Sequence, residues 1–260
     1  MKERQTKLKM KITWLVILII AGSCNNGTST TVLNNSEPGE SYCTTLLVIG
    51  DDRSGSTSDI RKLTSEDYRL LAETIGTKGG GTIAVCLIGN PHPQSREPFF
   101  LSMKSLDNIK PYNPKDTKLT LTEKTQLKLA NEKIITSNNE ILAGQSDAIR
   151  NFLYSSIEPN VINYKSPGSD HTDLDDAILR INTMVNEPQY KQYDKIIVAL
   201  ISDGKNQRDK KIQPIQSKIT NKKAEVYLIG WKSAVDCFNG LTQYQLSSKD
   251  AFIEIIKNLK

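Results

Sequence analysis

The sequence predicts an α/β fold in which a doubly wound, mostly parallel sheet carries helices on both faces. Continuous apolar runs such as residues 44–50 and 195–201 are typical of strands buried on both faces. Segments with helical periodicity separate these runs, most clearly at residues 174–185. Strands and helices therefore alternate along the chain, which favours parallel strands joined by helical crossovers.

Each element of this fold has its own signal. Strands are predicted at residues 44–50, 82–88, 195–201, 224–230 and 241–247, with a short edge strand at 99–103. Helices are predicted at residues 64–75, 121–136, 146–155, 174–185, 214–222 and 249–260. Thr64 caps the first of these helices with Asp67 as its capping-box partner, and Gly76 is expected to end it. Part of residues 90–165 is expected to be a surface insertion, with residues 121–136 a helix packed near the rim of the ligand site.

The N-terminal end has the pattern of an export signal. A basic segment precedes the apolar run 12–22, which is shorter than the roughly 20 residues that span a bilayer. The sequence Ala21-Gly22-Ser23-Cys24 resembles a bacterial lipobox, with Ala21 where Leu is usual. This resemblance implies that residues 1–23 are a signal peptide and that Cys24 is lipidated. Cleavage without lipid and an uncleaved anchor are the alternatives.

The rest of the chain divides into a tether and one large domain. Residues 24–43 are rich in Asn, Ser, Thr and Gly, a composition that cannot bury a core and that is typical of a flexible linker. Residues 44–260 form the predicted domain. Most of the net charge of +5 lies in the first 23 residues, so the domain is near neutral and carries no electrostatic footprint for nucleic acid. Besides Cys24 there are three cysteines, an odd number that leaves open one disulfide such as Cys43–Cys237.

Oxygen-bearing side chains follow two of the predicted strands. Asp52, Ser54 and Ser56 alternate in the loop after residues 44–50, and Asp203 follows residues 195–201. Thr172 lies in a third loop, just before the helix at 174–185. The carboxyl ends of parallel strands meet at one edge of a sheet, and carboxylates with hydroxyls suit a hard cation. The pattern predicts a site for Mg²⁺, with Mn²⁺ or Ca²⁺ as alternatives.

These three segments together resemble the metal-ion-dependent adhesion site of von Willebrand factor A domains. All five ligand positions are present in order: Asp52, Ser54, Ser56, Thr172 and Asp203. The resemblance implies a Rossmann-like fold, direct contacts from the hydroxyls, and a coordination position open to an acidic side chain of a protein ligand. It therefore implies a non-enzymatic protein that binds or assembles partners in a metal-dependent way, anchored to a bacterial cell envelope by lipid.

Two other functions remain open from the sequence. A metal-assisted hydrolase would use the same cation, with His171 as the one evident general base near the motifs. A structural subunit with an idle metal site is the other alternative.

Overall fold

The computed structural model describes residues 42–54, 57, 62–89, 97–165, 172–208, 211–232 and 236–259. They form a six-stranded sheet in the order β3-β2-β1-β4-β7-β8 and a separate pair of strands, β5-β6. Every neighbouring pair in the large sheet is parallel except β2 and β3, which are antiparallel. The chain has the predicted α/β, Rossmann-like doubly wound architecture.

The element boundaries are as follows. The strands are β1 (Thr45–Asp52), β2 (Gly81–Ile88), β3 (Phe99–Met103), β4 (Lys195–Ile201), β5 (Asn206–Arg208), β6 (Lys211–Gln213), β7 (Ala224–Ile229) and β8 (Thr242–Leu246). The helices are α1 (Ser65–Lys78), α2 (Leu121–Phe152), its π-helical continuation η3 (Leu153–Ile162), α3 (Leu174–Val185), η4 (Pro188–Tyr190), η5 (Asp236–Phe238) and α4 (Lys249–Lys257). Within the described ranges, no helix combines the length and apolar character needed to cross a bilayer.

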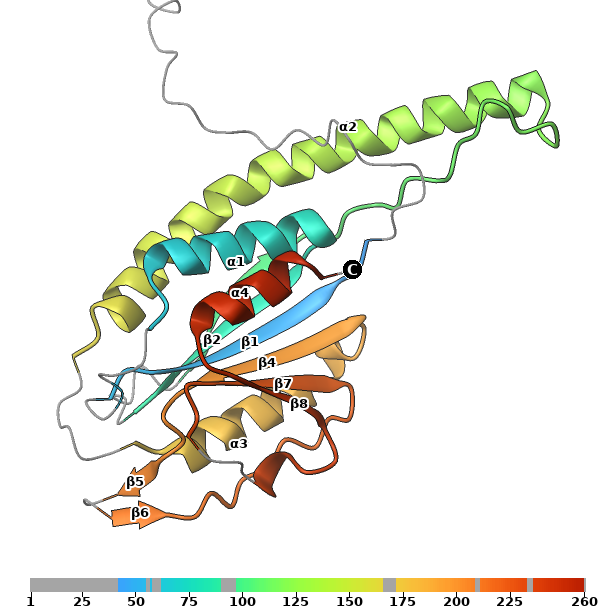
Figure 1. The fold of residues 1–260 in the computed structure, drawn as a ribbon. Helices are drawn as coiled ribbons and strands as arrows, with labels where there is room; N and C mark the ends of the chain where they lie inside the picture. The colour runs from blue at the N-terminus through green and yellow to red at the C-terminus, as the bar shows by residue number, and fades with distance from the viewer. Residues whose placement is uncertain are drawn as a thin grey trace, which may run out of the picture. The chain divides into compact units, whose positions relative to one another are not determined.

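Two apolar cores lie on the two faces of the sheet. Along β1 the buried side chains alternate, so Leu47 and Ile49 enter one core while Leu46 and Val48 enter the other. The first core also contains apolar residues of α1, α4 and η3, whereas the second contains those of α3. Figure 1 shows the same division, with α1, α2 and α4 on one side of the sheet and α3 on the other. Burial on both faces explains why the strand sequences are continuously apolar.

Helix α1 begins as predicted but ends later. Thr64 and Asp67 form the capping box, each accepting a hydrogen bond from the other's backbone N–H. Gly76 was expected to end the helix, but α1 continues to Lys78 and Gly79 follows at a φ of 144°. Gly76 instead lies where α2 approaches closely, since a Cβ there would lie 2.4 Å from Gln145 Oε1. The glycine serves helix packing rather than termination.

The two helices predicted at residues 121–136 and 146–155 are one. Helix α2 continues through Asn138, which lies in the gap between the two predicted helices, because that side chain has hydrogen-bond partners outside the helix. Asn131, Asn138 and Gln145 lie seven residues apart and bond the backbone of Lys110, Asp107 and Lys104 respectively. We call these three side chains the carboxamide ladder. They hold an extended segment, residues 104–110, antiparallel to the helix.

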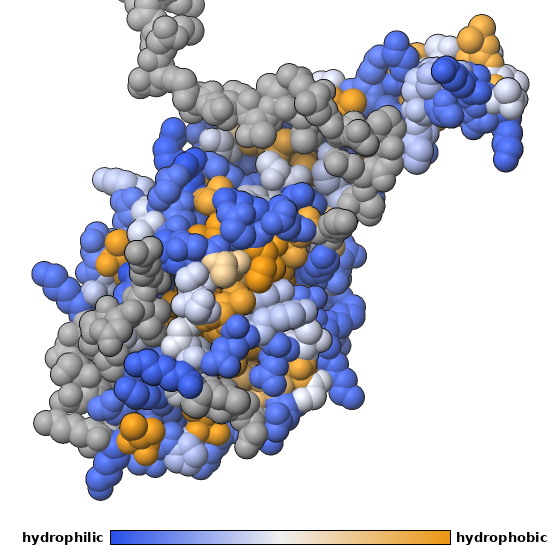
Figure 2. Space-filling model, in the orientation of Figure 1, coloured by the Kyte–Doolittle hydropathy of each residue, from blue (hydrophilic) through white to orange (hydrophobic). Residues whose placement is uncertain are grey.

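The position expected for residues 121–136 was wrong, although the segment is helical. Strand β3 ends at Met103, opposite Gly81, which is the first residue of β2. The extended segment leads away from there, so the first half of α2 lies beyond the sheet edge opposite the predicted metal site (Figure 1). Figure 2 shows that this projecting part is mostly hydrophilic, and residues 121–130 are largely exposed.

The helix predicted at residues 214–222 is absent, and the described segment there is irregular. Side chains of α3 bond backbone N–H groups of this segment. Asp175 Oδ1 accepts from the N–H groups of Gln216 and Ser217, and Asn182 Oδ1 accepts from Thr220 N–H. Hydrogen bonds to α3 thus hold this segment in place without a helix, while Ile219 is still buried in the second core.

The cysteines of the described residues form no disulfide. Cys86 is fully buried in β2, Cys237 is buried in η5, and Cys43 is partly buried ahead of β1. The Cys43–Cys237 bridge that the sequence left open is therefore not formed in this structure. Cys24 and the rest of residues 1–41 lie outside the described part of the chain.

Candidate metal centre

Asp52 ends β1 and Asp203 follows β4, two neighbouring strands at the point where the strand order reverses. Strand β1 has β2 on one side and β4 on the other, and ligands of doubly wound sheets bind at the carboxyl end of such a reversal. In the register of these strands, Asp51 is paired with Ile201. Asp52 and Ser202 therefore stand at the same level, one residue farther on.

Asp52 is buried and held by three hydrogen-bond donors. Its Oδ1 accepts from the Ser54 backbone N–H at 2.9 Å, and its Oδ2 accepts from Ser202 Oγ at 2.7 Å. The Ser54 hydroxyl also bonds this carboxylate. Burial raises the pKa of Asp52, the serine hydrogen bonds lower it in part, and the negative charge of Asp203 raises it further. Two carboxylates are thus close enough to repel each other, an arrangement that a cation relieves.

Asp203 presents a buried oxygen with an incomplete set of partners. Its Oδ1 accepts from the Lys205 backbone N–H at 3.1 Å. Its Oδ2 is buried and accepts no hydrogen bond from the described residues. The Lys205 Nζ lies 3.2 Å from Oδ2, as an ion pair outside hydrogen-bond geometry. A buried carboxylate oxygen normally has a bonding partner, so this one is a candidate cation ligand.

The loop after β1 directs the first serine toward Asp52. Ser54 is fully buried, and Thr57 Oγ1 donates to the backbone oxygens of Ser54 and Asp52 at 2.8 and 3.1 Å. These bonds close the loop into a turn around the motif. Ser56 lies outside the described residues, so its predicted role as a ligand stays a prediction.

Thr172 reaches this region through the strand pair β5-β6. It is buried and forms an antiparallel bridge with Gln207 through two hydrogen bonds. The Thr172 N–H donates to Gln207 O at 2.8 Å, and the Gln207 N–H donates to Thr172 O at 2.9 Å. Asn206 Oδ1 also accepts from Leu174 N–H, at the first turn of α3. The loop that carries Thr172 is therefore fastened to the segment following Asp203. His171 lies outside the described residues.

A buried ionic network that the sequence reading missed adjoins the motif. Asp51 Oδ2 accepts from Arg53 Nη2 and from Tyr68 Oη, both at 2.6 Å, and Arg53 Nη2 also donates to Leu63 O at 2.6 Å. Burial lowers the pKa of Arg53, but the Asp51 charge more than offsets it, so the net pKa is raised. Burial and the Asp51 charge raise the pKa of Tyr68. The only sequence signal was a second aspartate before the motif, at a position that also fits an ordinary strand end.

Cations of the chain itself surround the acidic groups. Lys62 Nζ donates to Ser54 O at 3.4 Å, and burial, followed by the charge of Arg53, lowers its pKa. Arg53 pairs with Asp51, and Lys205 pairs with Asp203. Hence each carboxylate of the region has a positive group nearby, although Asp52 receives its hydrogen bonds from neutral donors.

The donor set fits a hard divalent cation. Asp52 and Asp203 are both buried and the Ser54 hydroxyl bonds Asp52, and oxygen ligands of this kind would suit Mg²⁺, Mn²⁺ or Ca²⁺ rather than Zn²⁺. Among the described residues, no group of three or more His, Cys, Asp or Glu side chains is arranged to hold a metal. The predicted site contains two carboxylates and otherwise hydroxyls, so it differs from such a cluster.

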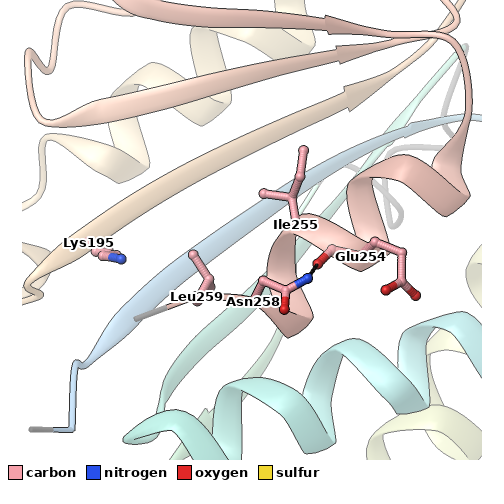
Figure 3. A pocket seen from close by; sticks show the side chains of 5 residues that line it. All are labelled: Lys195, Glu254, Ile255, Asn258 and Leu259. Carbon is pink, nitrogen blue, oxygen red and sulfur yellow. Dashed lines mark hydrogen bonds between the residues drawn. The ribbon is translucent and has the colours of Figure 1, made fainter.

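A surface cavity lies at the opposite end of β4. It has a volume of about 480 Å³ and is lined by Lys195, Glu254, Ile255, Asn258 and Leu259. Lys195 is the first residue of β4, so this cavity is at the amino end of the strand and the predicted site is at its carboxyl end. In Figure 3, Glu254 and Ile255 come from α4, Asn258 and Leu259 from the residues after it, and Lys195 from β4; Asn258 Nδ2 donates to Glu254 O at 2.7 Å. Its lining does not contain the converging polar groups of the metal candidate.

Comparisons with known proteins leave the family open. Neither protein-family models nor curated protein sequences returned a match. Among solved structures, the chain is similar to proximal thread matrix protein 1 from the mussel byssus, at 13% identity and a TM-score of 0.38. The match covers 84% of this chain and 47% of the mussel protein, so the chain spans about half its length.

Proposed function

We propose that the domain binds a divalent cation through Asp52, Ser54, Ser56, Thr172 and Asp203, and uses it to hold an acidic side chain of a protein partner. The observation that carries this proposal is the pair of buried carboxylates, Asp52 and Asp203, of which Asp203 Oδ2 accepts no hydrogen bond from the described residues. The resemblance of the motif to the adhesion site of von Willebrand factor A domains supports the same function.

Each residue of the proposed site would have its own role in holding the ion and the partner. A bound Mg²⁺ ion would supply a positive charge that attracts a carboxylate oxygen of the partner. Asp52 and Asp203 balance that charge, while neutral hydroxyls from Ser54 and Thr172 leave it partly uncompensated. Ser202 and the Ser54 backbone fix the orientation of the Asp52 carboxylate through the hydrogen bonds described above. The role proposed for the ion is to bind a partner rather than to support a reaction.

Replacement of the aspartates tests the metal site. We expect Asp52→Ala to weaken Mg²⁺ or Mn²⁺ binding by at least about tenfold in calorimetry, because a charged ligand is lost. The fold should persist by circular dichroism, and Asp147→Ala on the exposed face of α2 should bind metal as the wild type does. Full metal affinity in the Asp52→Ala, Asp203→Ala double variant would contradict the site.

Partner binding should depend on the metal. In a pull-down, retention of the partner should be lost with EDTA and restored by Mg²⁺. Retention that is indifferent to EDTA would instead favour a structural subunit with an idle site. The alternative of a metal-assisted hydrolase predicts phosphatase or protease activity that EDTA abolishes.

The cellular setting is a separate proposal. We infer from the lipobox-like sequence at Cys24 that the protein is attached by lipid to a bacterial envelope, with residues 24–43 as its tether. The domain would then be held near the membrane surface, where it can meet other envelope proteins. Residues 1–41 lie outside the described part of the chain, so this proposal depends on the sequence alone.

A further inference from the structure

One cation of the chain contacts the oxygen that the proposed metal site needs. Asp203 Oδ2 is buried, and the Lys205 ammonium lies 3.2 Å from it. The two side chains differ sharply in exposure, at 3% for Asp203 and 44% for Lys205. The carboxylate is therefore fixed within the protein, whereas the lysine side chain has solvent into which it can withdraw.

Local geometry keeps the lysine near this oxygen. Gly204 adopts a φ of 76°, and the Lys205 backbone N–H returns to donate to Asp203 Oδ1 at 3.1 Å. A Cβ on Gly204 would lie 2.8 Å from the Trp231 ring, so the turn is packed against a buried side chain. Lys205 thus starts from a fixed backbone position beside the carboxylate, and only its side chain is free to move.

The other nearby cations bond to different atoms. Arg53 is held by Asp51 and the backbone oxygen of Leu63. Lys62 donates to the backbone oxygen of Ser54, not to a carboxylate. Lys205 is consequently the cation, among the described residues, whose charged group pairs with Asp203.

We infer that Lys205 is a built-in competitor of the divalent cation, so that its ammonium must leave Asp203 Oδ2 before the metal can use this oxygen. The inference rests on the proposed metal site and adds its regulation. A divalent ion held by Asp203, directly or through coordinated water, needs the same buried oxygen. Lys205 therefore lowers the metal affinity, and it stabilises the domain when divalent ions are scarce.

The test compares metal binding and stability in full-length variants. In calorimetric titrations with Mg²⁺ and Mn²⁺, Lys205→Met should bind about three- to fivefold more tightly than the wild type, because a partly exposed ion pair no longer competes. Lys205→Arg retains a cation and should stay within about twofold of the wild type. Lys211→Met removes an exposed charge from β6 and should have little effect at physiological salt.

A second measurement separates competition from a general change in charge. In EDTA, Lys205→Met should melt at a lower temperature than the wild type, because Asp203 Oδ2 then lacks its counter-charge. Saturating Mg²⁺ should remove that difference. A difference in melting temperature that persists in saturating Mg²⁺ would indicate a charge effect without competition and would contradict the inference.

The outcomes distinguish this inference from the proposed function. Equal metal affinity in Lys205→Met and the wild type, or an equal gain in Lys211→Met, would overturn the role of Lys205 while the metal site stands. Failure of the wild type and of Lys205→Met to bind either ion would overturn both.

Discussion

At the scale of single residues, the buried charge of Asp51 near the sheet edge is paired with Arg53. Asp51 accepts from Arg53 and Tyr68 within a largely buried network. Asp52 is held instead by the neutral donors Ser54 and Ser202. Removal of one partner from a buried pair is costly because the remaining charge stays desolvated. The two adjacent aspartates thus differ in their partners: Asp51 pairs with a charged side chain, and Asp52 bonds serine groups.

A third aspartate ties two helices together and makes stability depend on pH. Asp67 of α1 pairs with Lys249 of α4, and both side chains are largely buried. Burial raises the pKa of Asp67, but hydrogen bonds from Lys249 and Thr64 outweigh it, so the net pKa is lowered. The ionised side chain therefore stabilises the fold above the unfolded-state pKa of about 3.9, and this contribution is lost as the pH falls through the lower folded-state value.

We expect Asp67→Asn to lower the free energy of unfolding by about 1–3 kcal/mol at pH 7, since a charged hydrogen bond is lost. The difference from the wild type should shrink as the pH falls below about 4, where Asp67 becomes protonated on unfolding. Urea denaturation at several pH values measures this. Asp147→Asn, whose ion pair with Arg150 is exposed, is the control and should change little. A pH-independent difference would argue against the charged pair.

At the scale of elements, helices of this domain hold extended chain through side chains seven residues apart. The carboxamide ladder of α2 bonds the backbone at every third residue of the segment 104–110. Seven helical residues rise about 10.5 Å, close to the length of three extended residues, so the two repeats stay in register. On α3, Asp175 and Asn182 have the same spacing and bond residues 216–220. Polar side chains thus replace the hydrogen bonds of a sheet or helix.

The ladder should be needed for local order beside α2. Asn138 is fully buried and bonds both the N–H and the C=O of Asp107. Asn138→Ala should cost about 1–3 kcal/mol, the value of two hydrogen bonds to a partly exposed backbone. Hydrogen exchange should rise at residues 104–110 more than in the central strands. Ser137→Ala, the exposed neighbour, serves as the control, and equal exchange in both variants would contradict the ladder's role.

At the scale of the whole domain, the structure separates a sheet with two cores from a projecting arm. The arm consists of residues 104–131, the extended segment together with the first turns of α2 (Figure 1). Its distal side chains are mostly exposed, and the two core clusters contain none of them. The fold of the sheet therefore does not depend on the tip of the arm.

The arm can be shortened to test this independence. Because Asn131 bonds the backbone of Lys110, a Gly-Ser turn of about four residues can replace residues 112–127. We expect the melting temperature to stay within about 4 °C, which corresponds to a change below about 1 kcal/mol. Metal affinity should be unchanged because the arm lies at the opposite edge from Asp52. A large loss of stability would show that the arm belongs to the folding unit.

Much of the domain could be predicted from local sequence, because its elements carry their own signals. Continuous apolar runs located β1, β2, β4 and β7, and the α3 helix followed from its apolar face. The Thr64 capping box required only residues three apart in the chain. Asp52 and Asp203 could be placed at one edge because each directly follows a buried strand, and parallel strands end together.

Tertiary structure alone decided the features whose partners are distant in sequence. The sequence predicted two helices where α2 is one, because the bonds of Asn138 to Asp107 join segments distant in the chain. It predicted a helix at residues 214–222, where α3 instead bonds the backbone of an irregular segment. The position of Gly76 against Gln145 and the pairing of Lys205 with buried Asp203 likewise required the assembled fold. Apolar periodicity is a property of the chain itself, whereas the partner of a buried polar group depends on which segments pack together.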